Sequence, residues 1–267
     1  MPALLGIPLD VNSSYLRGPS RAPAKIREAL SSDASNKWSE LGVDVGAAGA
    51  VTDAGDLHLN DSREKVGDDF VTIERAISEL LKKGERPVSV GGDHSITHPI
   101  LRAFAKRYPD LTIVHFDAHP DLYDEFEGSR VSHACPFARI MEERLAKRLV
   151  QIGIRTLNGH QREQAEKFGV EIVQMRELPA YGRLEIHGPV YISFDIDVLD
   201  TAFAPGISHR EPGGMTTREA IAHLHAIAGT IVGADIVEYN PEQDIAGMTA
   251  VVAAKVLKEI LGKMIAA

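Results

Sequence analysis

The chain has a single cysteine, Cys135, in 267 residues. It therefore forms no intramolecular disulfide, and such sparse cysteine fits a reducing compartment. No apolar run approaches the roughly 20 residues of a membrane-spanning helix. The N-terminal segment 1–8 also lacks the basic start and the long apolar stretch of a secretory signal. These absences predict a cytoplasmic protein with no membrane partner.

Basic residues are in short supply as well. The sequence has 29 Lys and Arg against 38 Asp and Glu, which gives a net charge of -9 at pH 7. Because no basic patch offsets this charge, nucleic acid is not an expected partner. An acidic surface instead favours a small cationic substrate.

Short apolar runs alternate along the chain with segments of helical periodicity. Strands that are apolar on both faces, separated by helices, are typical of a parallel sheet covered on both sides. The sequence therefore predicts a three-layer α/β/α sandwich with a central, mostly parallel sheet. With 267 residues and no linker, one domain spanning 1–267 is expected. Strands are predicted at 4–9, 87–90, 111–115, 149–154, 170–175, 190–195 and 231–238, and helices at about 23–30, 70–83, 96–107, 163–168, 216–227 and 249–261.

The segment 31–66 is rich in Ser, Asp, Gly and Ala, and its pattern is weak. One short strand is expected within 43–51. Asp53, Asp56 and His58 are interpreted as turn-forming residues rather than ligands.

Potential metal ligands follow three of the predicted strands. Asp117, His119 and Asp121 come directly after the strand at 111–115, and their alternate spacing would point all three side chains the same way in an extended chain. Asp195 and Asp197 repeat this spacing after another apolar run. A strand-end Asp is usually a turn or helix cap, but recurrence in one chain favours ligands.

A third strand, 87–90, is followed by Gly91-Gly92-Asp93-His94. Ligands in parallel sheets gather at the carboxyl ends of the strands, so His94 is expected to join the acidic residues there. Two imidazoles and four carboxylates suit a pair of Mn²⁺ ions, whereas a zinc site is usually richer in Cys or His. The sequence therefore predicts a binuclear manganese site.

These motifs identify a resemblance that covers nearly the whole chain. It resembles the ureohydrolases, the manganese enzymes that include arginases and agmatinases, and is most similar to the plant-type arginases. The motifs are Gly91-Gly92-Asp93-His94-Ser95, Phe116-Asp117-Ala118-His119-Pro120-Asp121, Ser193-Phe194-Asp195-Ile196-Asp197 and Val237-Glu238-Tyr239-Asn240-Pro241.

The resemblance implies a role for each residue of the site. One Mn²⁺ would be held by His94, Asp117, Asp121 and Asp195, and the other by Asp117, His119, Asp195 and Asp197, so that Asp117 and Asp195 bridge. Asp121 would also pass a proton to the departing amine. His133 matches the proton-shuttling histidine. Glu238 matches the carboxylate that binds the guanidinium, and a charged residue at an apolar strand end needs a cationic partner in any case.

The substrate is less well defined than the reaction. Hydrolysis of L-arginine to L-ornithine and urea is preferred. Agmatine is the alternative, because animal and bacterial arginases carry an Asn that helps hold the α-carboxylate at the position where this chain has Tyr123. Ser129, Arg130, Ser132, Arg155 or Asn158 would then bind this group, and His209 would line the pocket.

Other possibilities stay open at this stage. A non-catalytic metabolite-binding relative would lack activity, and a zinc deacetylase-like amidohydrolase would carry one metal ion. By strict alternation His115 shares the face of the ligands and lies behind them, unless a bulge intervenes. Cys135 is either a buried thiol or a nucleophile. The resemblance also implies a homo-oligomer, a trimer or a hexamer.

Overall fold

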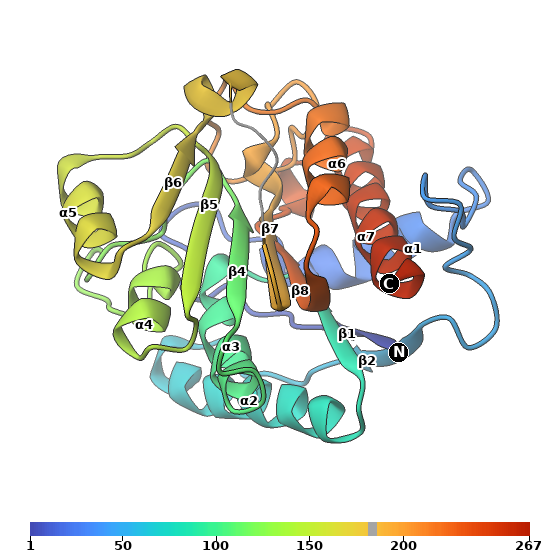
Figure 1. Cartoon of the computed structure of the whole chain (residues 1–267), viewed down its shortest axis with the longest axis horizontal. Coiled ribbons are helices and arrows are strands. Elements are labelled where there is room, and N and C mark those ends of the chain that lie inside the picture. The colour runs from blue at the N-terminus through green and yellow to red at the C-terminus, as the bar shows by residue number, and fades with distance from the viewer. Residues whose placement is uncertain (181–185) are drawn as a thin grey trace.

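A computed structural model describes residues 1–180 and 186–267. Its centre is an eight-stranded sheet with the strand order β2-β1-β3-β8-β7-β4-β5-β6 (Figure 1). All the strand pairs are parallel, which confirms the predicted α/β sandwich. The strands are β1 (Pro2–Gly6), β2 (Thr52–Asp56), β3 (Arg86–Val90), β4 (Thr112–Phe116), β5 (Arg148–Ile154), β6 (Glu171–Gln174), β7 (Pro189–Asp195) and β8 (Thr230–Val237).

Helices cover both faces of the sheet (Figure 1). One face packs against α2 (Val66–Lys82), α3 (Thr97–Ala105), α4 (Pro136–Glu142) and α5 (Gly159–Phe168), and the other against α1 (Ala22–Ser31), α6 (Thr217–Ala226) and α7 (Met248–Ala266). Short 3₁₀ turns lie at Pro19–Arg21, Arg63–Lys65, His94–Ile96, Met175–Ala180, Ile196–Val198 and Pro241–Gln243.

Each face of the sheet has its own apolar core, as alternation along a buried strand requires. In β4, Val114 and Phe116 belong to the cluster under α1, α6 and α7, whereas Ile113 belongs to the cluster under α2 to α5. His115 is fully buried on the same face as Ile113, because it stacks on Phe137 of α4. A polar side chain therefore lies within this second core.

Local signals fix several helix ends where the sequence predicts them. The capping box at the start of α6 is confirmed: the Glu219 backbone N–H donates to Thr216 Oγ1 at 3.1 Å, and the Thr216 N–H donates to Glu219 Oε2 at 2.8 Å. Gly84, with φ 77°, follows α2 and supplies the left-handed conformation that ends it.

Two predictions for the less regular parts of the chain are wrong. The second strand lies at Thr52–Asp56, not within 43–51. Asp53 and Asp56 belong to this strand and pair with Arg27 of α1, and Asp53 Oδ1 also accepts the Gly55 N–H at 2.9 Å, as the turn interpretation expects. Because β2 is a largely exposed edge strand, it has no apolar alternation to reveal it. Helix α4 was not predicted, although Pro136 occupies a position at its start that proline favours.

None of the helices in the described part of the chain is long and apolar enough to span a membrane.

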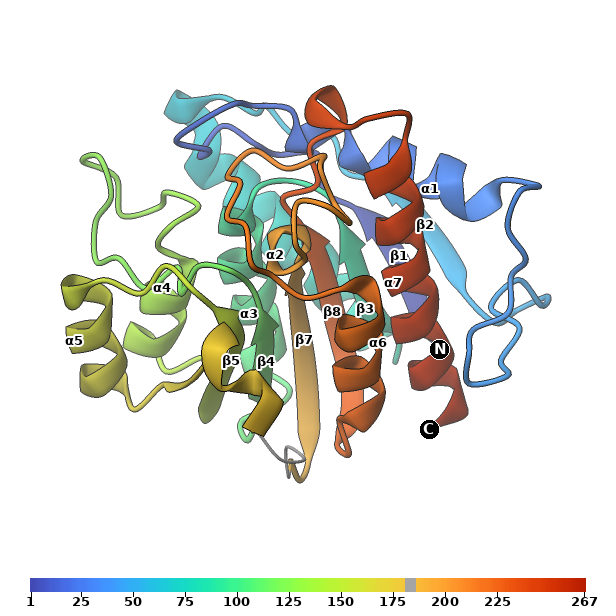
Figure 2. The same cartoon turned by 90° about the horizontal axis from the view of Figure 1, so that it is seen from above.

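Long loops at 7–21, 117–135 and 199–216 gather at the edge of the sheet where the central strands end (Figure 2).

Candidate metal centre and substrate pocket

Four adjacent strands, β3, β8, β7 and β4, occupy the middle of the sheet and deliver the site at their carboxyl ends. Asp117 directly follows β4, Asp195 is the last residue of β7, and Glu238 directly follows β8. His94 begins the 3₁₀ turn that follows β3. The structure thus brings the residues predicted from distant parts of the sequence to one place.

The imidazole of His94 faces three carboxylates. Its Nδ1 atom lies 3.0 Å from Asp121 Oδ2, 3.1 Å from Asp117 Oδ2 and 3.2 Å from Asp195 Oδ2. Within residues 1–180 and 186–267, this buried nitrogen makes no hydrogen bond. Ligand atoms at about 2.1 Å from an octahedral cation lie roughly 3 Å apart, so the spacing fits a shared cation.

A second group of ligand atoms adjoins the first. His119 Nδ1 lies 2.8 Å from Asp197 Oδ2 and 3.4 Å from Asp117 Oδ1. Asp117 therefore faces His94 with one oxygen and His119 with the other. A carboxylate placed in this way suits a bridge between two cations, as the resemblance implies.

Four carboxylates are concentrated in the cluster. Asp117, Asp121, Asp195 and Asp197 are all buried, and their partners in residues 1–180 and 186–267 are imidazoles and backbone N–H groups. Burial, together with the charges of Asp197 and Asp117, raises the pKa of Asp195 well above its usual range. A bound cation would offset the repulsion among these buried carboxylates. The donor set therefore fits two divalent metal ions.

Backbone conformation at the strand ends is constrained. Gly92 has φ 84°, and a Cβ atom there would lie 2.7 Å from the carbonyl oxygen of Leu9, so this turn before His94 needs glycine. Asp121 (φ 48°) and Glu238 (φ 61°) also adopt left-handed conformations, although neither is glycine. Such conformations are costly and are concentrated at functional sites.

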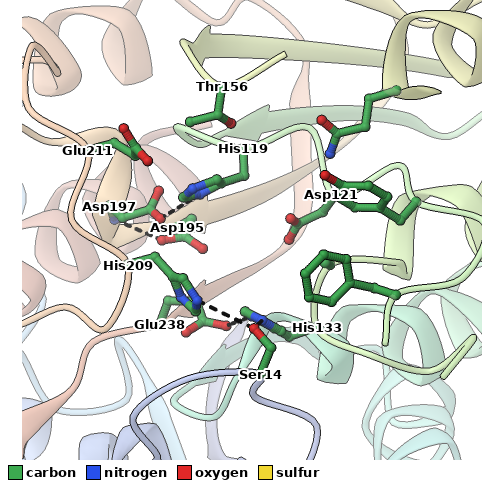
Figure 3. A pocket seen from close by; sticks show the side chains of 14 residues that line it. Ser14, His119, Asp121, His133, Thr156, Asp195, Asp197, His209, Glu211 and Glu238 are labelled. Carbon is green, nitrogen blue, oxygen red and sulfur yellow. Dashed lines mark hydrogen bonds and ion pairs between the residues drawn. The ribbon is translucent and has the colours of Figure 1, made fainter. Parts of the chain in front are cut away.

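A cavity of about 160 Å³ opens beside the cluster. Figure 3 shows His119, Asp195 and Asp197 on one side of it and Glu238, His133 and Ser14 on the other. The residues that line it are Ser14, His119, Asp121, Tyr123, Phe126, His133, Ala134, Thr156, Gln161, Asp195, Asp197, His209, Glu211 and Glu238.

Glu238 and His133 form a buried pair on the wall of this cavity. Glu238 Oε1 accepts the backbone N–H of His94 at 2.9 Å and lies 3.0 Å from His133 Nδ1. Burial disfavours the imidazolium, but the Glu238 carboxylate outweighs it and raises the pKa of His133 to about 9. His133 Nε2 lies 2.9 Å from Ser14 Oγ. At neutral pH this histidine therefore carries a proton at the edge of the cavity.

The candidate substrate contacts do not all reach the cavity. Tyr123 and His209 line it, and the Tyr123 hydroxyl accepts a hydrogen bond from Asn158 Nδ2 at 2.6 Å. Ser129 lies instead in an adjoining cavity of about 130 Å³, where its hydroxyl accepts the Val131 N–H. The tight turn at 126–129, closed by two backbone hydrogen bonds, directs it away from the first cavity.

Two arginines considered as carboxylate ligands are occupied elsewhere. Arg130 pairs with Asp124 and Glu142 on the surface. Arg155 donates to the backbone carbonyls of Asp197 and Glu211 and so ties the loops around the site together. Neither lines the cavity.

Several lining residues are not identified by sequence reasoning. Ser14, Thr156, Gln161 and Glu211 come from loops or from the start of a helix, and no spacing rule marks them.

Polar residues within the apolar strands do indicate, from the sequence, side chains that support the ligands. Ser193 lies 3.0 Å from His94 Nε2 and donates to Asp235 on β8 at 2.7 Å, which orients this imidazole from behind.

Cys135 is a fully buried thiol. Burial, together with the charge of Asp121, raises the pKa of the thiol to about 12. The thiolate is therefore not populated near neutral pH, and the position is that of a structural cysteine rather than a nucleophile.

A parallel α/β sheet that delivers a cluster of imidazoles and carboxylates beside a cavity defines a metal-dependent hydrolase scaffold. The sequence profile of the Arginase family matches residues 2–262, and the chain belongs to this family. It is thus a hydrolase of the ureohydrolase class.

Similar proteins agree with this family. The chain is 45% identical to "Arginase 1, mitochondrial" of Arabidopsis thaliana, over 98% of this chain and 80% of that protein. It is 34% identical to the agmatinase of Bacillus anthracis, over 97% of this chain and 90% of that protein. The solved structure of the arginase from Medicago truncatula superposes with a TM-score of 0.92 and 41% identity, covering 98% of this chain and 87% of that one.

Proposed function

We propose that the protein hydrolyses L-arginine to L-ornithine and urea with two Mn²⁺ ions per chain. The observation that carries this proposal is a buried carboxylate, Glu238, placed across a cavity from a cluster suited to two cations. His94, Asp117, His119, Asp121, Asp195 and Asp197 would hold the ions. When bound, such a pair of ions lowers the pKa of the attacking water to near neutrality.

Glu238 binds the guanidinium group in this proposal. Its carboxylate is buried and faces a cavity whose described lining contains no Lys or Arg. A cationic substrate would therefore supply a second positive partner for this carboxylate, beside the protonated His133. The attachment of Glu238 to the His94 backbone N–H fixes this carboxylate relative to the ligands.

Asp121 and His133 move the protons. Water adds to the guanidinium carbon, and the bond from this carbon to the side-chain nitrogen then breaks, so that the departing amine needs a proton. Asp121 takes a proton from the attacking water and delivers it to this nitrogen. His133, protonated at neutral pH, supplies protons from the solvent side.

A feature of the adjoining cavity favours arginine over agmatine. The two cavities share Ser14 and Phe126, and the exposed residue Arg63 lines the second one. No other Lys or Arg lines either cavity within residues 1–180 and 186–267. Arg63 is thus placed to attract an α-carboxylate that agmatine lacks.

Replacing Arg63 by Met is expected to raise KM for L-arginine by up to about 5-fold, because an exposed ion pair contributes up to about 1 kcal/mol. KM for agmatine should stay the same or fall, since this substrate has only positive charge. Steady-state urea release with both substrates measures the effect. Lys65→Met, on the same exposed turn but outside both cavities, is the control. Equal changes for both substrates would remove Arg63 from carboxylate recognition.

The substrate itself is tested by comparing kcat/KM for L-arginine and agmatine with the Mn²⁺-loaded protein. We expect a clear preference for arginine. A preference for agmatine would reassign the protein as an agmatinase, and two bound Mn²⁺ ions without urea from either compound would support a non-catalytic relative.

We also propose a homo-oligomer, a trimer or a hexamer, that works in the cytoplasm. Exposed apolar side chains at Ile245, Met248 and Val251, around the start of α7, support association. The single buried cysteine supports a reducing compartment, although the name of the Arabidopsis thaliana relative places that protein in mitochondria.

A further inference from the structure

A buried hydrogen-bond chain lies behind Asp117. Gln151 of β5 and His115 of β4 are register partners in the sheet, and both are fully buried. Gln151 Nε2 lies 3.0 Å from His115 Nδ1, and His115 Nε2 lies 2.7 Å from Asp117 Oδ2. The chain therefore runs from a neutral amide through an imidazole to a candidate ligand of both cations.

The orientation of the Gln151 amide is fixed by a backbone group. Its Nε2 atom also lies 2.6 Å from the carbonyl oxygen of Pro120, and a carbonyl can only accept a hydrogen bond. The amide nitrogen thus uses one hydrogen on Pro120 and the other on His115. The opposite orientation would place Oε1 against the carbonyl oxygen, where two acceptors would repel each other. In the observed orientation the buried Oε1 atom has no hydrogen-bond partner among the described residues.

This orientation determines where His115 carries its proton. Because Nδ1 accepts a hydrogen bond from Gln151, it has no proton, and the proton of the neutral ring is on Nε2. The Nε2–H group then donates to Asp117 Oδ2. Stacking on Phe137, with ring centroids 3.9 Å apart, holds the plane of the ring.

The same reasoning excludes His115 as a metal ligand. His94, His115 and Asp117 lie close enough together to suggest a three-ligand site. However, Nδ1 of His115 is used by Gln151, and Nε2 carries a proton, so neither nitrogen has a lone pair for a cation. The proximity of His115 reflects its hydrogen bond to Asp117.

We propose that Gln151 is a positioning residue, which sets the tautomer of His115 and thereby holds Asp117 in the orientation that reaches both cations. This inference rests on the proposed role of Asp117 as a bridging ligand. Asp117 faces His94 with Oδ2 and His119 with Oδ1, so a rotation of its carboxylate disturbs both groups. Partners of this kind usually change metal affinity about 10- to 100-fold.

A double-mutant cycle on Mn²⁺ binding tests the inference. Gln151→Met keeps the side-chain volume but donates nothing, and His115→Phe keeps the stack on Phe137 without the nitrogens. Each substitution should weaken Mn²⁺ binding about 10-fold by calorimetry on metal-free protein. Because both side chains act through one hydrogen-bond chain, their effects should not multiply. The Mn²⁺ affinity of the double variant should lie within about 3-fold of that of the more weakly binding single variant.

The control is Gln164→Met. Gln164 on α5 is another buried glutamine whose Oε1 has no partner in the part of the chain that the structure describes, but it lies outside the cluster and the cavity. Its substitution should leave Mn²⁺ affinity unchanged. Wild-type affinity in Gln151→Met, or fully multiplicative losses in the double variant, would overturn the inference.

A second measurement needs no substitution and covers the case of variants that do not fold. Neutron diffraction from the Mn²⁺-loaded wild-type protein should locate a proton on His115 Nε2 and none on Nδ1, and the reverse pattern would overturn the inference. Urea assays on the wild-type protein are independent of both results. Coupled losses of Mn²⁺ affinity without urea from arginine would reject the proposed substrate and retain the role of Gln151.

Discussion

Replacing Asp195 by Asn should reduce urea release from L-arginine about 10²- to 10⁴-fold, even at saturating Mn²⁺. Asp195 Oδ2 lies against His94 Nδ1, and the resemblance to the ureohydrolases makes this side chain the proposed second bridge between the cations. Removing one buried charge from an ionic cluster typically costs about 3–5 kcal/mol, and each 1.36 kcal/mol corresponds to about tenfold in rate. Mn²⁺ affinity should fall with the activity.

The same substitution should have the opposite effect on the stability of the metal-free protein. Burial and the charges of Asp197 and Asp117 raise the pKa of Asp195, so its ionised form destabilises the fold. For an acid with a raised native pKa, the unfolded chain binds fewer protons, and this penalty grows as the pH rises above about 4. Metal-free Asp195→Asn should therefore unfold at a higher temperature than the wild type at pH 8, and the difference should vanish in acid.

Thermal unfolding with and without Mn²⁺ measures both effects. Added Mn²⁺ should stabilise the wild type more than the variant and so reverse their order, because a ligand stabilises the state that binds it. Asp110→Asn, at an exposed surface carboxylate, is the control and should change neither quantity. A metal-free variant less stable than the wild type would contradict the electrostatic account of the cluster.

The second large effect is expected for Glu238→Gln. Breaking a buried ion pair with the substrate typically costs about 2–5 kcal/mol, so kcat/KM for arginine should fall on the order of 10²- to 10³-fold. The amide keeps the volume and an acceptor for the His94 N–H. Mn²⁺ binding should therefore remain close to that of the wild type, in contrast to the Asp195 variant.

The loss in Glu238→Gln should also change the pH dependence. Without the carboxylate, the main interaction that raises the pKa of His133 is removed, so this imidazole should lose its proton at lower pH. Residual activity should then decline at a lower pH than in the wild type. Glu242→Gln, on the exposed loop that follows β8, is the control. Unchanged kcat/KM in Glu238→Gln would place guanidinium binding elsewhere.

The core of the site is predictable because its residues follow buried strands. Asp117, Asp195 and His94 each come after an apolar run, and the parallel fold necessarily brings such strand ends to one edge. The edge strand β2 cannot be predicted in this way, because neither of its faces is buried and its sequence has no apolar pattern. The metal ligands thus depend on the regular part of the fold, which sequence periodicity reveals.

The substrate end of the site depends on loops, whose conformation has no periodic signal. Tyr123 and Ser129 belong to one loop, yet they reach different cavities because the turn at 126–129 reverses the chain between them. Ser14 and Arg63 approach from distant segments. Gln151 carries a readable signal, a polar residue in a buried strand, but its role follows only from the position of the Pro120 carbonyl.

The most direct test of the central claim is the number of Mn²⁺ ions that the active protein binds. Metal-free protein is titrated with Mn²⁺ while bound metal and urea release from L-arginine are measured on the same samples. We predict two ions per chain, with activity that reaches its maximum only as the second site fills. Full activity at one ion per chain, or without Mn²⁺, would contradict the assignment of His94, His119 and their carboxylates to a two-cation site.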